Sequence, residues 1–106
     1  MNYYILKDKK IKSVDQETWG FWMEEQFELK EKSERILKKN RIGTFEVSTV
    51  FLGINHNFLN PNDPILFETM IFPECKYCVR SRTYDDALKE HEIAVAIQQL
   101  LYDSER

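Results

Sequence analysis

Alternating apolar and β-branched residues in the middle of the chain predict its two clearest strands. Residues 44–52, TFEVSTVFL, are rich in β-branched and aromatic side chains and follow a turn at residues 40–43. Residues 65–72, ILFETMIF, form a second and mostly apolar run after a loop at residues 53–64 that is crowded with Asn, Pro and Asp. We expect two central strands, joined by a loop long enough to carry a function.

Weaker patterns on either side add strands to this sheet. Residues 3–14 read YYIL, a polar turn KDKK, and then IKSV, which predicts a hairpin. The charged residues 30–34 could continue a helix or form a loop, and we favour a loop into a strand at residues 35–39. Residues 77–82 are expected to pair as an edge strand. The predicted sheet is antiparallel and has four to six strands.

Two segments have helical spacing. Asp15 is placed to cap a helix over residues 16–29, in which Trp19, Trp22 and Met23 recur at helical intervals. Thr83 begins a second helix in the manner of a capping box, with an Asp three residues on in place of Glu or Gln.

The last helix is apolar on two faces when its residues are spaced by 100°. One face holds Ala87, His91, Ala94, Val95, Leu101 and Tyr102, and the other holds Ile93, Ile97 and Leu100. The first face is expected to pack on the sheet. The second is a candidate homodimer contact, although a helix buried on both sides of one core would show the same pattern.

These elements predict an α+β fold, with two helices and the C-terminal one packed on one face of the sheet. The chain has 106 residues, enough for one core, so residues 1–106 are expected to form a single domain. With 15 Lys and Arg against 18 Asp and Glu, its formal net charge is −3, and it has no dense basic stripe for double-stranded DNA. Neither a membrane span nor a secretory leader is evident, which predicts a cytoplasmic protein.

Several catalytic motifs are excluded by composition. The chain has three glycines, at positions 20, 43 and 53, and both the dinucleotide fingerprint GxGxxG and the phosphate loop GxxxxGK[ST] need glycines at closer spacing. The GxSxG and HExxH motifs are also absent from the sequence.

Cys75 and Cys78 form the only metal-like spacing, and twelve residues separate Cys78 from His91, as in half of a zinc finger. His56 would have to supply a fourth ligand from the middle loop. The alternative is a pair of reduced cysteines near an edge strand. No cofactor is favoured, and a structural zinc module is kept as a third hypothesis.

Glu68, His56 and His91 are the candidate polar site. Glu68 interrupts an apolar strand, so its carboxylate is either paired at an edge or part of a site. His91 lies on the apolar face of the last helix, and His56 lies between two asparagines in the loop. Each histidine alone is read as structural, but convergence of the three would indicate acid-base or metal chemistry.

Aromatic residues of the first helix could form a stacking surface for nucleotides or the core face of an amphipathic helix. Trp19 and Trp22 are the candidate ligand-binding residues, together with Phe21 and Phe27 in the wider set. Residues 30–39 are read as a solvated charged stretch.

The pattern STVFLG (residues 48–53), His56, FETM (residues 67–70) and a C-terminal AxxxH ending at His91 resembles a group of small phage and prophage proteins. Members similarly open with a Tyr-rich strand pair and an Asp that begins a Trp-containing helix. The middle loop differs, since it holds Asn and Pro in place of a glycine-rich run. The resemblance carries no catalytic residue with it.

We therefore expect a small phage-type accessory protein in the cytoplasm of a bacterial host. It would act by binding, and would either inhibit a host defence factor or sequester a small nucleotide signal. The competing hypothesis is a small metal-dependent or acid-base hydrolase that uses His56, Glu68 and His91.

Overall fold

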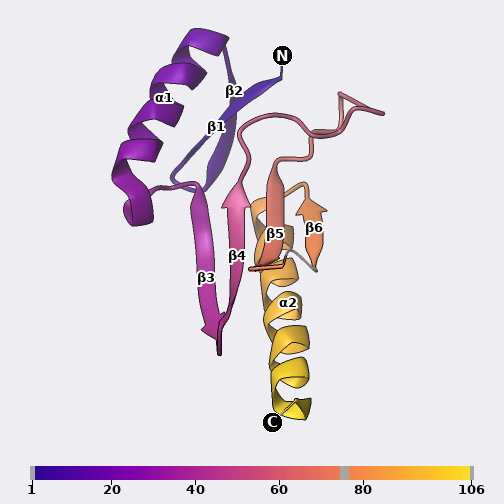
Figure 1. Ribbon diagram of the computed structural model, residues 1–106. Coiled ribbons are helices and arrows are strands. Elements are labelled where there is room, and N and C mark those ends of the chain that lie inside the picture. The colour runs from indigo at the N-terminus through magenta and orange to yellow at the C-terminus, as the bar shows by residue number, and fades with distance from the viewer. Residues whose placement is uncertain (1, 75–76, 106) are drawn as a thin grey trace.

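The computed structural model describes residues 2–74 and 77–105, and Figure 1 shows the path of the chain. Its strands are β1 (Tyr3–Lys7), β2 (Lys10–Val14), β3 (Ile36–Ile42), β4 (Phe45–Phe51), β5 (Phe67–Phe72) and β6 (Cys78–Ser81). Its helices are α1 (Gln16–Leu29), the short 3-10 helix η1 (Lys30–Lys32) and α2 (Tyr84–Ser104).

The predicted α+β class is confirmed, and the strands divide between two antiparallel sheets. The strands β3, β4, β5 and β6 lie side by side in that order, while β1 and β2 form a separate hairpin. One backbone bridge, between Tyr3 and Ile54, joins the hairpin to the long loop. The hairpin and α1 lie together at one end of the four-stranded sheet (Figure 1).

Both helices begin at the predicted caps. The Asp15 carboxylate accepts a hydrogen bond from the Thr18 amide at 2.7 Å, and the Thr83 hydroxyl accepts one from the Asp86 amide at 3.0 Å. Each bond satisfies an amide that the first helical turn leaves without a partner. The helix α1 covers the predicted residues, 16–29.

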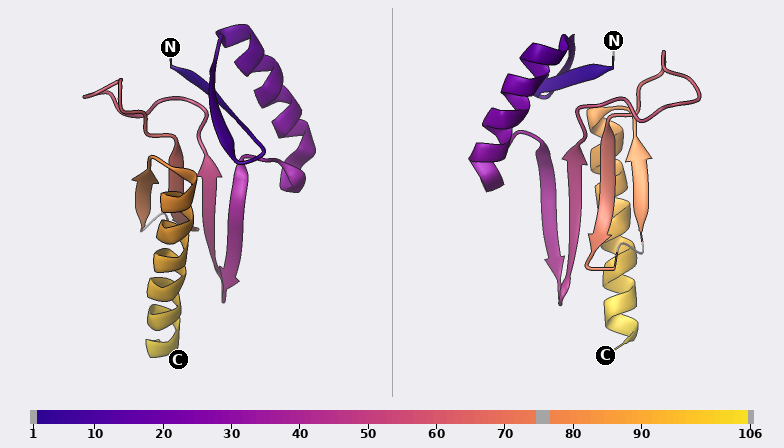
Figure 2. Two further views of the ribbon diagram at one scale, coloured as in Figure 1. Left: turned by 180° about the vertical axis from the view of Figure 1, so that it is seen from behind. Right: turned by 45° about the horizontal axis from the view of Figure 1, so that its top comes forward.

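The two faces of the four-stranded sheet differ because side chains alternate along each strand. The helix α2 contacts all four strands on one face, which we call the helix face. Thr49 and Thr69 are register partners on this face. The adjacent residues therefore point to the other face, which we call the open face and which carries Ile36, Val50, Glu68, Met70, Cys78 and Arg80. Figure 2 shows α2 on one side of the sheet only.

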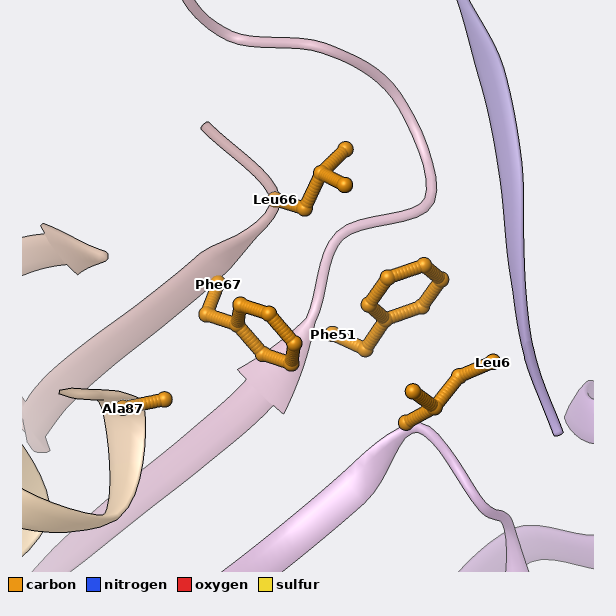
Figure 3. Close-up of a cluster of buried hydrophobic side chains, with 5 residues drawn as sticks. All are labelled: Leu6, Phe51, Leu66, Phe67 and Ala87. Atoms are coloured by element: carbon orange, nitrogen blue, oxygen red, sulfur yellow. The ribbon is translucent and has the colours of Figure 1, made fainter. Parts of the chain in front are cut away.

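Two apolar clusters hold these layers together. Figure 3 shows the first, which contains Leu6, Phe51, Leu66, Phe67 and Ala87 and so draws on the hairpin, the sheet, the long loop and α2. The second lies farther along α2 and contains Ile42, Val47, Ile71 and Ala94. The core therefore lies mainly between the helix face and α2.

The predicted sheet-packing face of α2 is confirmed at its centre, and the prediction is wrong for one residue at its edge. Ala87, His91 and Ala94 are buried against the sheet, but Leu101 is half exposed. Leu101 lies at the margin of the buried arc, where a helix turns away from a flat surface. Ile93, Ile97 and Leu100 are exposed in the single chain.

The strand predicted at residues 35–39 is longer than the apolar pattern indicates. The strand β3 continues to Ile42, and the turn predicted at residues 40–43 is reduced to Gly43 and Thr44. Asn40 and Arg41 pair with β4 in regular register. Their polarity suits this position because β3 is an edge strand and because Asn40 has a buried hydrogen-bond partner, described below.

None of the described helices combines the length and apolarity that a membrane crossing needs.

Candidate functional site

A chain of buried polar side chains lies between α2 and the helix face. His91 is fully buried, and its Nδ1 is 2.7 Å from the hydroxyl of Thr49. That hydroxyl is 2.7 Å from the hydroxyl of Thr69, and the His91 Nε2 is 2.7 Å from the amide oxygen of Asn40. Three strands and one helix therefore meet through four polar side chains.

The neutral form of His91 satisfies this chain of hydrogen bonds. The Nε2–H group donates to Asn40, Nδ1 accepts from Thr49, and Thr49 in turn accepts from Thr69. Burial lowers the pKa of the His91 imidazole below its ordinary value, since a charged ring would lose its hydration. The charge of Glu92 acts in the opposite direction and that of Lys38 in the same direction. His91 is thus a neutral core residue in contact with no solvent.

Glu68 lies on the other side of the sheet. Its carboxylate accepts a hydrogen bond from Arg80 Nε at 3.0 Å, and the two residues are register partners on β5 and β6. The Glu68 side chain is 15% exposed, so the carboxylate is largely enclosed but has a charged partner. Because Thr69 faces His91, its neighbour Glu68 must face away from it. The sheet therefore separates Glu68 from His91, and the condition for a shared acid-base or metal site, convergence of these side chains, is not met by this pair.

His56 lies in the loop between β4 and β5, where it orders the backbone. Its Nδ1 is 2.7 Å from the carbonyl oxygen of Ile54, and its amide donates to the carbonyl of Ile65. Asn55 and Asn57 make further side-chain bonds to the loop backbone. In the described parts of the chain, no hydrogen bond or ion pair connects His56 with Glu68 or His91. The loop carries His56 as a structural residue.

Of the candidate zinc ligands, the two that the structure describes, Cys78 and His91, are not brought together either. Cys78 is exposed on the open face, opposite Met70, whereas His91 is buried on the helix face with both ring nitrogens already hydrogen bonded. Cys75 lies outside the described residues. Residues 2–74 and 77–105 hold no group of three or more His, Cys, Asp or Glu side chains that could bind a metal ion. The ligand set of Cys75, Cys78 and His91 is wrong in its pairing of Cys78 with His91.

Trp19 and Trp22 attach α1 to the rest of the molecule. The Trp19 ring lies 5.2 Å from that of Tyr3, and the Trp22 ring makes an edge contact with Phe51 at 5.8 Å. The Trp19 Nε1 is buried and has no hydrogen-bond partner among the described residues. Both rings are half-buried and used in side-chain packing, which favours the core interpretation over a stacking surface.

A groove of about 360 Å³ lies where the end of α1 meets the open face. Phe27, Lys30 and Arg35 are among the residues that line it, and Ile36 and Val50 supply apolar surface. Phe27 is 82% exposed, although its helical spacing groups it with the core aromatics. Glu31 also lines the groove, and its carboxylate is paired with Lys39 at 3.1 Å.

Arg35 is the unusual side chain of this groove. The sequence does not single it out, because it lies within a stretch of many charged residues. Its Nε donates to the carbonyl oxygen of Phe51 at 3.1 Å. Burial lowers the pKa of the guanidinium, which nonetheless stays charged at neutral pH. No carboxylate of the described chain forms an ion pair with it. The groove therefore holds a partly dehydrated cation that lacks an anionic partner.

A buried glutamine explains how the groove forms. The Gln26 side-chain oxygen accepts hydrogen bonds from the Ser33 hydroxyl at 2.9 Å and from the Glu34 amide at 2.6 Å. These bonds fix the turn between α1 and β3, and so bring Phe27 and Arg35 into the lining of one groove. A glutamine in the last turn of a helix was the one sequence signal for this arrangement.

Comparison with family models, with curated proteins and with solved structures found no match for this chain.

Proposed function

We propose that this chain is a small accessory protein of phage type that acts by binding and sequesters a small nucleotide. The groove beside Arg35 is the site, and a nucleoside monophosphate is the class of ligand. Sequestration is favoured over inhibition of a host protein because the groove has the dimensions of a small-molecule site, near the lower end of the usual range of about 300–1,000 Å³.

The state of Arg35 carries the proposal. A half-buried guanidinium has lost part of its hydration, and without a carboxylate partner it lacks the charge that usually offsets this loss. A phosphate group supplies that charge and matches the two-pronged geometry of a guanidinium. Lys30 adds a second positive charge to the lining of the groove.

The remaining surfaces of the groove suit a base. An exposed aromatic ring such as Phe27 offers a face on which a base can stack, and Ile36 and Val50 provide an apolar floor. A ligand with a flat ring at one end and an anion at the other therefore fits these residues better than either part alone.

The hydrolase hypothesis has weaker support, since it needs Glu68 and His91 in one site and they lie on opposite faces of the sheet. The predicted homodimer through Ile93, Ile97 and Leu100 stays a prediction, as does a location in the host cytoplasm.

Isothermal titration calorimetry of the full chain with AMP, GMP, CMP and UMP tests the proposal. We expect saturable binding of at least one nucleotide, with adenosine and inorganic phosphate binding more weakly than the intact monophosphates. The Arg35→Gln variant should bind about 10-fold to 100-fold more weakly, because a hydrogen bond to a charged group contributes about 1.5–3 kcal/mol. Phe27→Ala should lose about tenfold through the stacking contact.

Two matched variants control for charge and surface changes. Arg41→Gln removes an exposed arginine of β3, the strand that begins directly after Arg35, and Phe21→Ala removes an exposed ring of α1, the helix that holds Phe27. Both variants should bind as the native chain does. Lys30→Gln removes a groove cation at an exposed position and should weaken binding if Arg35→Gln proves unstable. Absence of binding by all four nucleotides, or equal losses in the control and groove variants, would refute the proposal.

A further inference from the structure

The outer surface of α2 carries an apolar stripe with a regular repeat. Ile93, Ile97 and Leu100 are separated by four and three residues, and all three are exposed. This spacing places them on one side of the helix, like the a and d positions of a coiled coil. The side chains buried on the sheet, Ala87, His91, Ala94 and Gln98, occupy a different side. The stripe is therefore available to a partner after the chain has folded.

A second repeat runs along one edge of this stripe. Lys89, Ala96 and Asp103 are separated by seven residues each, so they lie almost in line along the helix. Lys89 has no ion-pair partner in the described chain, and Asp103 accepts only a bond from the neutral Gln99 amide at 3.1 Å. Along the helix, the line thus runs from the positive charge of Lys89, past the small side chain of Ala96, to the negative charge of Asp103.

We propose that a second copy of this chain covers the stripe, with the two α2 helices antiparallel. In this orientation the twofold axis passes beside Ala96, and Lys89 of each copy faces Asp103 of the other. Ile93 of each copy packs against Leu100 of the other, the two Ile97 side chains meet near the axis, and the small Ala96 allows close approach there. A parallel pair would instead align Lys89 with Lys89 and Asp103 with Asp103, which is unfavourable.

The charges favour a second copy over an unrelated helix, and the helix dipoles favour the antiparallel orientation. When a second copy runs in the opposite direction, Lys89 and Asp103 each face the opposite charge, as an interface with twofold symmetry requires. Antiparallel α2 helices also bring opposite dipole ends together. From Lys89 to Asp103 the contact extends over about 21 Å of helix, which is 14 residue steps of about 1.5 Å each. Because one helix from each copy makes the whole contact, we expect a dimer that dissociates on dilution.

The proposed dimer does not depend on the nucleotide proposal. The groove beside Arg35 includes Val50 on the open face, whereas α2 lies on the helix face. Both copies would keep an accessible groove.

Sedimentation equilibrium of the full chain over a range of concentrations from 1 μM to 1 mM tests the dimer. We expect a monomer–dimer equilibrium, and Ile97→Asp should remain monomeric over this range. Leu100→Asp is a second variant of the stripe in case Ile97→Asp is unstable. Leu59→Asp, at a fully exposed leucine of the long loop, is the control and should dimerise as the native chain does. A monomer at every concentration, or a dimer unaffected by both stripe variants, would refute the proposal.

Charge reversal tests the antiparallel orientation. Lys89→Glu and Asp103→Lys should each dimerise several-fold more weakly, since each creates two repulsive pairs. An equimolar mixture of the two variants should form heterodimers more tightly than either forms homodimers, because each cross-pair then joins opposite charges. A mixture that associates no better than its components would rule out this orientation, even if the stripe variants abolish the dimer.

Discussion

At the scale of single residues, His91 shows how a polar side chain is accommodated in a small core. The ring is fully buried, but each of its nitrogens has a partner at 2.7 Å. The two partners come from different strands, so the ring links β3 and β4 to α2 in a defined orientation. An apolar residue of similar size would remove the partner of the Asn40 side-chain oxygen and one of the two partners of the buried Thr49 hydroxyl.

The buried imidazole makes stability depend on pH. The folded state holds the pKa of His91 below its ordinary value, so the unfolded chain binds more protons once the pH falls below about 6.5. The contribution of His91 is therefore complete above that pH and is lost as the pH falls toward the folded-state pKa. We expect a lower melting temperature at pH 5.5 than at pH 7.5, and a smaller difference in His91→Gln.

The chain's other histidine provides the control for this measurement, since the sequence contains two. His56→Gln should keep the pH dependence of the native chain. If thermal scans give His91→Gln the same dependence as the native chain, the titration of His91 does not set it.

Replacement of glycine by alanine should have opposite effects on stability at Gly43 and at Gly20. Gly43 has a φ of +61°, and a Cβ there would lie 2.6 Å from the ring of Tyr102. Gly43→Ala should therefore lower the free energy of unfolding by at least about 1–2 kcal/mol, from backbone strain alone. Gly20 lies inside α1, and a Cβ there would have open space within 4 Å, so Gly20→Ala should raise the free energy of unfolding by up to about 1 kcal/mol. Urea denaturation of the two variants measures both changes, and a loss at Gly20 with none at Gly43 would contradict this account.

At the scale of elements, local chemistry predicted where helices begin, because a cap is a contact between residues three apart. Asp15 with Thr18 and Thr83 with Asp86 are such contacts. The end of β3 was missed because its reason is not local. Asn40 suits this edge strand because His91, 51 residues away in sequence, donates a hydrogen bond to its side-chain oxygen.

The candidate site was predicted less well than the fold, for the same reason. Glu68 was correctly singled out as a carboxylate that needs a partner, and the structure supplies Arg80. The face on which Glu68 lies depends on which face α2 covers, and the apolar pattern of β5 does not specify this. Phe27 was named only as a member of a stacking surface with the tryptophans of α1, and Arg35 was missed, because the groove is created by the turn that Gln26 stabilises.

At the scale of the whole molecule, the two sheets are joined by one apolar cluster. Leu6 comes from the hairpin, Phe51 and Phe67 from the four-stranded sheet, and Trp22 of α1 packs against the same group. The Phe51 ring makes edge-to-face contacts with the rings of both Trp22 and Phe67. Because these residues belong to both sheets, we expect the sheets to unfold together.

Phe51→Ala tests this coupling. The side chain is fully buried, so its removal should lower the free energy of unfolding by about 3–5 kcal/mol. Tryptophan fluorescence reports on α1, which holds both tryptophans, and far-ultraviolet circular dichroism also reports on α2. In a cooperative molecule both signals shift to the same lower urea concentration. Phe58→Ala, at a ring that is 80% exposed, should shift neither. Separation of the two transitions in Phe51→Ala would mean that the hairpin and α1 unfold independently of the four-stranded sheet.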